Sequence, residues 1–244
     1  MQALAISGDK EVLLYLMDLV EHPRGDNTLP ERVIDALYFA FVEPTGIKPV
    51  DGGFLKPISD RVSLLLYDTS LSSTARNDST ALLVALGPPD CIPYFTKMIG
   101  FAEDPTKYRW MGVQKGIRCA KLQGMQAIIE ALDPETGYER GLLDKYLWDE
   151  ILKLGELPKV ASAAEQLLKS DSWVARVTGI EVLARVGDSS NIDSIKALSG
   201  DKARLKNWWG DQAKLPKGER KPIPTIGELA ANVAQKLASG TKAK

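Results

Sequence analysis

Residues 171–198 read DSWVARVTGIEVLARVGDSSNIDSIKAL, and this stretch decides the fold of the chain. Its apolar spacing predicts a helix, a short turn and a second helix. A close copy lies one hundred residues earlier, where Ala75, Arg76, Leu83, Gly87 and Ile92 match Ala175, Arg176, Leu183, Gly187 and Ile192. Identity at these offsets, with an Ala-Arg start and a glycine after the helix, indicates an internal repeat.

An arginine anchors each of the clearest repeat units, at Arg32, Arg76 and Arg176. Steps of four, seven and ten residues from these arginines give Ala36, Phe39 and Val42; Thr80, Leu83 and Leu86; and Ile180, Leu183 and Val186. This spacing is typical of the buried stripe of a helix. Arg32 and Arg76 are 44 residues apart (76 − 32), within the roughly 40–47 residues of helical-pair repeats.

The rest of the chain is expected to be helical as well, with no competing strand pattern. Helices are predicted at residues 9–21, 30–42, 59–67, 91–101, 142–154, 158–169, 190–198 and 225–238. Residues 109–132, which contain Arg118, are predicted to form an irregular or unpaired helix. The next anchor position is Asp144, and the segment between Arg118 and Asp144 is too short for a full helical pair. A glycine after the last helical turn, as at Gly187, predicts a left-handed cap. An Asp or Ser is expected to cap the helix that follows.

Three segments interrupt the repeats and are predicted to be inserted loops. They cover residues 43–58, 133–141 and 209–224, which are rich in proline, glycine and charge. The third separates residues 201–208 from the last helix, and residues 239–244 are expected to form a flexible tail. Insertions on a repeat scaffold commonly map to surface loops. The sequence therefore predicts one helical repeat domain over residues 1–244.

Charge and hydropathy exclude several classes of protein. Lys plus Arg number 31 against 32 Asp plus Glu, which speaks against a protein whose main task is to grip nucleic acid. No uncharged apolar run approaches the roughly 20 residues of a membrane helix, and the first residues do not resemble a signal peptide. We expect a soluble chain, with the cytoplasm favoured, or an exported protein if the chain is part of a longer precursor.

The few cysteine and histidine residues limit the available chemistry. Cys91 and Cys119 make neither a disulfide framework nor a zinc-ligand spacing, and the pattern favours two buried thiols, although a single bond between them stays open. His22 is the only histidine and is expected to lie exposed at a helix end. A Ser-His-Asp or Cys-His site is therefore not expected, nor is a metal site of several histidines. No cofactor is expected.

The units around Arg76 and Arg176 resemble HEAT-type repeats, and are most similar to the short HEAT-like class first described in phycobilin lyases. The resemblance covers roughly residues 30–238 and is strongest at residues 142–198. It implies an all-α, right-handed α–α superhelix of about five helical pairs that binds proteins along a concave surface. It also implies that Arg32, Arg76 and Arg176 bond to neighbouring turns and acidic groups. A motif of this kind carries no catalytic residues.

Three clusters are candidate partner-binding residues. Trp208 and Trp209, near Arg204, suit an aromatic anchor, because Trp and Arg are enriched among binding hot spots; the alternative is that the loop at residues 209–224 covers the exposed ring. A basic run of Lys214, Lys217, Arg220 and Lys221 has the alternative of a solvated loop. Tyr108, Arg109 and Trp110 form an aromatic and cationic cluster whose alternative is packing of an irregular helix.

The resulting hypothesis is a non-catalytic scaffold that binds a protein partner along its concave face or its inserted loops. Two alternatives stay open. HEAT-like DNA glycosylases excise alkylated bases with aromatic, Asp and Arg side chains, which Trp110, Trp208 and Arg204 could imitate, but the charge balance argues against a basic groove. The other alternative is an accessory role similar to that of phycobilin lyases.

Overall fold

The computed structural model describes residues 1–42, 52–66, 68, 70–86, 91–100, 107–132, 140–205, 215–219 and 222–240. In this part of the chain all regular elements are helices, and the only β pairing is an isolated antiparallel bridge between Arg204 and Thr225. The prediction of an all-α protein is confirmed. The helices fall into two compact units, Met1–Cys119 and Ala120–Lys244.

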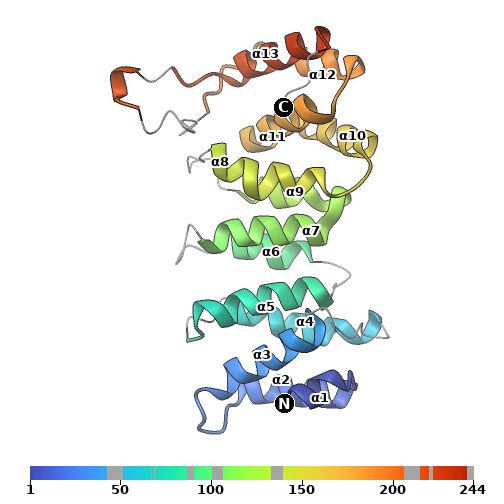
Figure 1. The fold of residues 1–244 in the computed structure, drawn as a ribbon, viewed down its shortest axis with the longest axis vertical. Helices are drawn as coiled ribbons and strands as arrows, with labels where there is room; N and C mark the ends of the chain where they lie inside the picture. Colours follow the sequence, from blue (N-terminus) through green and yellow to red (C-terminus); the bar gives the residue numbers. More distant parts are fainter. Residues whose placement is uncertain are drawn as a thin grey trace. The chain divides into compact units, whose positions relative to one another are not determined.

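In unit 1 (Met1–Cys119) the helices pack in two rows (Figure 1). Its elements are α1 (Gln2–Ile6), α2 (Lys10–Glu21), α3 (Leu29–Phe41), α4 (Gly52–Leu65), α5 (Ser73–Leu86), α6 (Ile92–Gly100) and the first part of α7 (Lys107–Glu130). Helix α3 packs between α1 and α5, while α2 packs against α4. The two rows meet where α2 packs on α3 and α4 packs on α5.

In unit 2 (Ala120–Lys244) helix α11 is the centre of the packing. The elements after α7 are α8 (Arg140–Leu143), the π-helical η1 (Asp144–Trp148), α9 (Asp149–Leu152), α10 (Leu157–Leu167), α11 (Trp173–Val186), the 3₁₀ turn η2 (Ser189–Asn191), α12 (Ile192–Lys196), the 3₁₀ turn η4 (Lys217–Glu219) and α13 (Ile226–Ala238). Helix α11 contacts α10, α13 and η1, and α12 packs on α13 (Figure 1). Most of α11 is buried, including the polar residues Thr178 and Glu181.

The one-hundred-residue repeat reappears in the hydrogen bonds that start α5 and α11. The Ser72 hydroxyl accepts from the Ala75 N–H at 3.2 Å, and the Ser172 hydroxyl accepts from the Ala175 N–H at 3.4 Å. In each case a serine caps the helix three residues before the alanine, which satisfies a backbone donor that the first turn leaves unpaired. The two matching sequence segments therefore start their helices with the same hydrogen bond.

The anchor arginines differ in how they are held. Arg176 bonds to a neighbouring turn and to an acidic group, with its Nε 2.9 Å from the Asp201 carboxylate and its Nη1 2.8 Å from the Ser170 carbonyl. Arg32 lies on the surface, with 62% of its side chain exposed and its guanidinium 3.7 Å from the Asp26 carboxylate. Arg176 therefore makes the structural bonds expected of the anchor arginines, whereas Arg32 makes a long contact at the surface.

The predicted buried stripe of α3 is wrong at one position, Phe39. Ala36 is buried, but Phe39 is 38% exposed, and the core residues of this helix are instead Val33, Ile34 and Leu37. Helix α3 packs against α1, α2 and α5, so three neighbours decide which of its faces is buried. The repeat spacing alone does not contain this information.

The boundaries of the inserted loops are also partly wrong. Helix α4 begins at Gly52, within the predicted loop of residues 43–58, and contains Pro57. Within the predicted loop, Ile58 is buried on the same face of α4 as Val62 and Leu65. The loop predicted at residues 133–141 ends earlier, since α8 begins at Arg140.

Residues 201–205, which precede the third predicted loop, are not helical and pair with the start of α13. The Ile226 N–H donates to the Ala203 carbonyl at 2.9 Å, and the Gly227 N–H donates to the Asp201 carbonyl at 2.9 Å. The backbone polar groups of this segment are thus paired with the start of α13 and not with a helix of their own. Residues 206–214 lie outside the described part of the chain.

The left-handed cap predicted at Gly187 is not present. Gly187 has φ −70° and ψ 170°, which is extended backbone. A Cβ at this position would lie 2.6 Å from the Leu183 carbonyl oxygen and 3.0 Å from the Asn191 side-chain oxygen. The glycine is required for this close approach and not for a positive φ. Asp188 caps the following turn as expected.

The two cysteines, expected as separate thiols, form a disulfide. Their Cα atoms are 6.3 Å apart, within the usual range for a disulfide. Helices α6 and α7 pack against each other as a hairpin. A Cβ added to Gly112 of α7 would lie 3.4 Å from the Met98 side chain of α6. Cys91 stands seven residues before Met98, and Cys119 stands seven residues after Gly112, so the hairpin brings them opposite each other. Sequence spacing alone does not reveal this register.

Helix α7 has the irregularity that the sequence predicts for residues 109–132. Lys121 has φ 54° and ψ −163°, values outside the helical region, and interrupts the helix between its two halves. The division between the two units falls next to this point, after Cys119.

Candidate binding groove

A groove of about 360 Å³ lies in unit 2 between the second half of α7 and α10. Its lining residues are Leu122, Gln123, Met125, Gln126, Lys159, Ser162, Ala163, Gln166 and Leu167. The α10 members recur at intervals of three and four residues, which places them on one face of that helix. We call this feature the α7–α10 groove.

The groove has an apolar floor and polar walls. Met125 and Leu167 are buried at its base. The side chains of Gln123, Gln126, Lys159, Ser162 and Gln166 are exposed along its sides. An amide side chain carries both donors and an acceptor, so it can pair with a peptide backbone in either sense. The arrangement suits a ligand with apolar side chains and main-chain amides.

Charges at the rim of the groove are balanced. Lys159 is 3.2 Å from the carboxylate of Glu156, and the Gln126 amide donates to the Glu130 carboxylate at 2.8 Å. Ser170 also donates to Glu130, at 2.6 Å. Because opposite charges lie beside each other, the groove has no strong preference for an anion or a cation.

A second cluster in unit 2 joins an arginine, two carboxylates and a tryptophan. Arg185 lies 2.7 Å from the Asp144 carboxylate and 3.1 Å from the Glu181 carboxylate, with its guanidinium 5.2 Å from the centre of the Trp148 ring. The Trp148 indole N–H donates to the Thr178 hydroxyl at 3.2 Å. Trp148 is fully buried and Glu181 is 4% exposed. This cluster joins η1 to α11, and because Trp148 is buried it offers no open aromatic face to a ligand.

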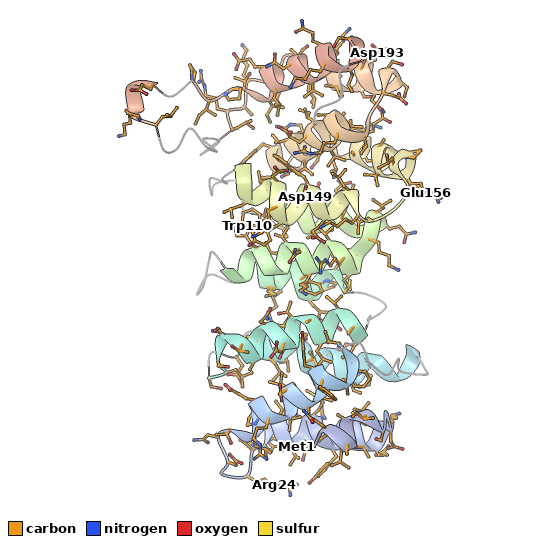
Figure 2. The ribbon with its side chains drawn as sticks, viewed as in Figure 1. Met1, Arg24, Trp110, Asp149, Glu156 and Asp193 are labelled. Carbon is orange, nitrogen blue, oxygen red and sulfur yellow. A yellow bond between two sulfur atoms is a disulfide. The ribbon has the colours of Figure 1, made fainter. Side chains whose placement is uncertain are left out.

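The residues predicted to bind a partner are not brought together by the described structure. Trp110, labelled in Figure 2, is only 5% exposed and belongs to the core of unit 1, as its alternative interpretation held. Arg204 is exposed and lies opposite Thr225 in the β-bridge, and Lys217 is exposed in η4. Trp208, Trp209, Lys214, Arg220, Lys221 and the side chains of Tyr108 and Arg109 lie outside the described residues.

A metal-binding cluster is not found in the described residues. No group of three or more His, Cys, Asp or Glu side chains there is placed to hold a metal ion. His22 is exposed at the C-terminal end of α2, as expected from the sequence. No described helix is long and apolar enough to cross a membrane.

Two aspartates in unit 1 have shifted pKa values. Hydrogen bonds from Thr28 hold the pKa of Asp26 below its ordinary value. Burial on α5 raises the pKa of Asp78, and the carboxylate of Asp35 on α3 raises it further. Local hydrogen bonds explain the shift at Asp26, and burial with a neighbouring carboxylate explains the shift at Asp78.

Asp78→Asn is expected to stabilise unit 1 near neutral pH. A carboxyl whose pKa is raised on folding binds its proton more tightly in the folded chain, so its ionised form opposes folding above that raised pKa. The penalty disappears as the pH falls below the ordinary value of 3.8. Thermal unfolding should show a higher midpoint for the variant at neutral pH and no difference below pH 3.8. A gain that is equal at both pH values would contradict this explanation, and Asp35→Asn should give part of the same gain.

The groove was not apparent from the sequence. Its polar residues at positions 123, 126, 159, 162 and 166 have the spacing of an ordinary solvated helix face. The two helices that form it are separated by a predicted loop and by the helix at residues 140–152. The amide-rich composition of the facing stripes is the one signal that could have indicated it.

Comparison of the chain with protein-family models, with curated proteins and with solved structures finds no match.

Proposed function

We propose that this chain is a non-catalytic scaffold, a right-handed α-solenoid of HEAT-like repeats that binds a segment of a protein partner. The α7–α10 groove carries the proposal for unit 2. The inserted loops predicted from the sequence, with Trp208 and Trp209, are the proposed second contact. Neither contact requires a cofactor.

The composition of the groove favours an extended peptide segment as its occupant. Buried Met125 and Leu167 would receive apolar side chains of the partner, because apolar surface removed from water contributes about 25 cal/mol per Å². The amides of Gln123 and Gln166 are placed along opposite walls to pair with the main chain of the partner. A volume of about 360 Å³ is within the range of ligand sites and accommodates a few residues of such a segment.

The repeated caps support the HEAT-like interpretation. Ser72 and Ser172 start α5 and α11 in the same way, one hundred residues apart. Both turns are also tied to an acidic side chain from an earlier helix: the Ser72 N–H donates to Glu31 at 2.8 Å, and the Ser170 hydroxyl donates to Glu130. Repeat units that bond to their predecessors in this way are typical of solenoids, in which each repeat contacts its neighbours.

The glycosylase-like alternative receives less support. It requires an open aromatic ring beside acidic and basic groups, because base recognition relies on stacking. Trp110 is 5% exposed and Trp148 is fully buried. The near-equal numbers of acidic and basic residues in the chain also disfavour a phosphate-binding groove.

Affinity capture with a blocked groove tests this function. Ser162→Arg places a long charged side chain in the groove. Binding of a partner over the apolar floor would then bury this charge without an opposite charge beside it, which costs binding free energy. We expect crosslinked capture from the source lysate to recover a stoichiometric protein with the unmodified chain. Recovery should fall about tenfold or more with Ser162→Arg, which corresponds to about 1.4 kcal/mol.

Ser194→Arg is the matched control, because Ser194 is exposed on α12 and does not line the groove. Trp208→Ala/Trp209→Ala tests the second contact in the same experiment. Equal recovery with Ser162→Arg and Ser194→Arg would exclude the groove as the binding site. Turnover of a small molecule by a chain that captures no protein would contradict the scaffold altogether.

A further inference from the structure

The disulfide of unit 1 has two chemically unequal ends. Cys91 is 4% exposed and immediately precedes α6, and its carbonyl accepts the Phe95 N–H at 3.3 Å in the first turn of that helix. Cys119 is partly exposed on α7. A thiolate outside the protein therefore meets the sulfur of Cys119 before it meets that of Cys91.

The position of Cys91 makes it the better leaving group. A thiolate at a helix N-terminus is stabilised by the N–H groups of the first turn and by the helix dipole. In thiol–disulfide exchange a more stable leaving thiolate departs faster. Helix α6 spans nine residues, long enough for this effect.

The sequence around Cys119 is cationic. Lys115 stands one helical turn before it, Arg118 stands next to it, and Lys121 follows two residues later. Low-molecular-weight thiols such as glutathione are anionic, and cationic surroundings raise their local concentration. The exposure of Cys119, the stability of the Cys91 thiolate as a leaving group and the cationic residues near Cys119 all favour attack on the Cys119 sulfur.

We propose that Cys91 and Cys119 form a reversible thiol–disulfide site whose co-substrate is a low-molecular-weight monothiol such as glutathione. The thiolate of the monothiol attacks Cys119 Sγ and forms a mixed disulfide, while the Sγ–Sγ bond breaks and its electron pair leaves on Cys91 Sγ. A second monothiolate attacks the sulfur of the bound monothiol and releases Cys119 as a thiolate. The protein disulfide and two monothiols yield two protein thiols and one oxidised monothiol disulfide.

Reduction has a structural consequence within unit 1. The disulfide joins the residue before α6 to α7, at a separation of 28 residues. It is the covalent closure of the α6–α7 hairpin, and Cys119 is the last residue of the unit. Opening the bond removes this covalent link and leaves the hairpin to its non-covalent contacts, which include the packing of Gly112 against Ile99 and Met98. The site thereby couples the redox poise of the surroundings to the order of α6 and α7.

Mass spectrometry of the folded full-length chain tests the proposal. The oxidised protein is mixed with limiting glutathione, quenched in acid and mapped for adducts, while circular dichroism follows the helical content. We expect reduction without loss of the fold and a glutathione adduct on Cys119. An adduct on Cys91, or reduction only after denaturant is added, would overturn the proposal.

Single-cysteine variants provide a second measurement. In Cys91→Ser the thiol of Cys119 should react with a maleimide at least about tenfold faster than the thiol of Cys91 does in Cys119→Ser, because accessible thiolates react first. Equal or reversed rates would overturn the direction of attack. If either variant fails to fold, adduct mapping on the unmodified chain decides alone.

Discussion

Arg176→Ala is expected to destabilise unit 2 by about 3 kcal/mol, the lower end of the cost of breaking a buried ion pair. The Arg176 and Asp201 side chains are only 17% and 16% exposed, and they meet at 2.9 Å. The same guanidinium also binds the carbonyls of Ser170 and Asp171 at 2.8 and 2.9 Å. Its removal leaves one carboxylate and two carbonyls without this donor, and such groups are costly to leave unpaired.

Denaturant unfolding followed by circular dichroism measures this loss. Arg32→Ala is the matched control, because Arg32 occupies the same place in the predicted repeat but is 62% exposed, and we expect no measurable change there. Arg176→Lys should restore only part of the stability, since an ammonium group cannot reproduce the planar fork of the guanidinium. Equal effects at Arg32 and Arg176 would contradict the assignment of Arg176 as a structural link.

Gly179→Ala is expected to destabilise unit 2 by about 2 kcal/mol, which is within the range for overpacking a core. Gly179 lies on the face of α11 that packs against α10. An added Cβ would lie 2.7 Å from the Ala164 carbonyl oxygen and 2.8 Å from the Leu168 side chain. Because the first of these atoms is backbone, α10 as a whole must move to make room.

Gly141→Ala separates this clash from helix propensity. Gly141 is in α8, and an added Cβ there meets no atom within 4 Å. Alanine gains about 1 kcal/mol over glycine in a helix, so this control should be neutral or stabilising. A stabilising effect of Gly179→Ala, measured by the same thermal unfolding, would show that α10 and α11 are not in the close contact described.

The sequence predicts local structure well where caps and apolar spacing agree. Residues 172–186 begin with a capping serine and continue with apolar residues, and α11 follows this pattern from Trp173 to Val186. The last helix, predicted at residues 225–238, is observed as α13 at Ile226–Ala238. In both cases the information lies within one helix and its first turn, which is why it can be read from the chain.

Features that depend on a neighbouring helix could not be read in this way. The Cys91–Cys119 bond depends on the register of the α6–α7 hairpin, and the exposed position of Phe39 depends on three helices around α3. The α7–α10 groove depends on two helices that are not consecutive in the chain. The proposed site is therefore determined mainly by packing between helices, whereas the helices themselves can be predicted from the sequence.

Hydrogen–deuterium exchange with and without the captured protein partner tests the proposed groove most directly. We expect slower exchange at residues 122–126 and 159–167, the two stretches that line the α7–α10 groove, with unchanged exchange in α12. Helical amides there already bond within their helices, so added protection would report a partner that suppresses local opening. A bound partner that protects neither stretch would contradict the account.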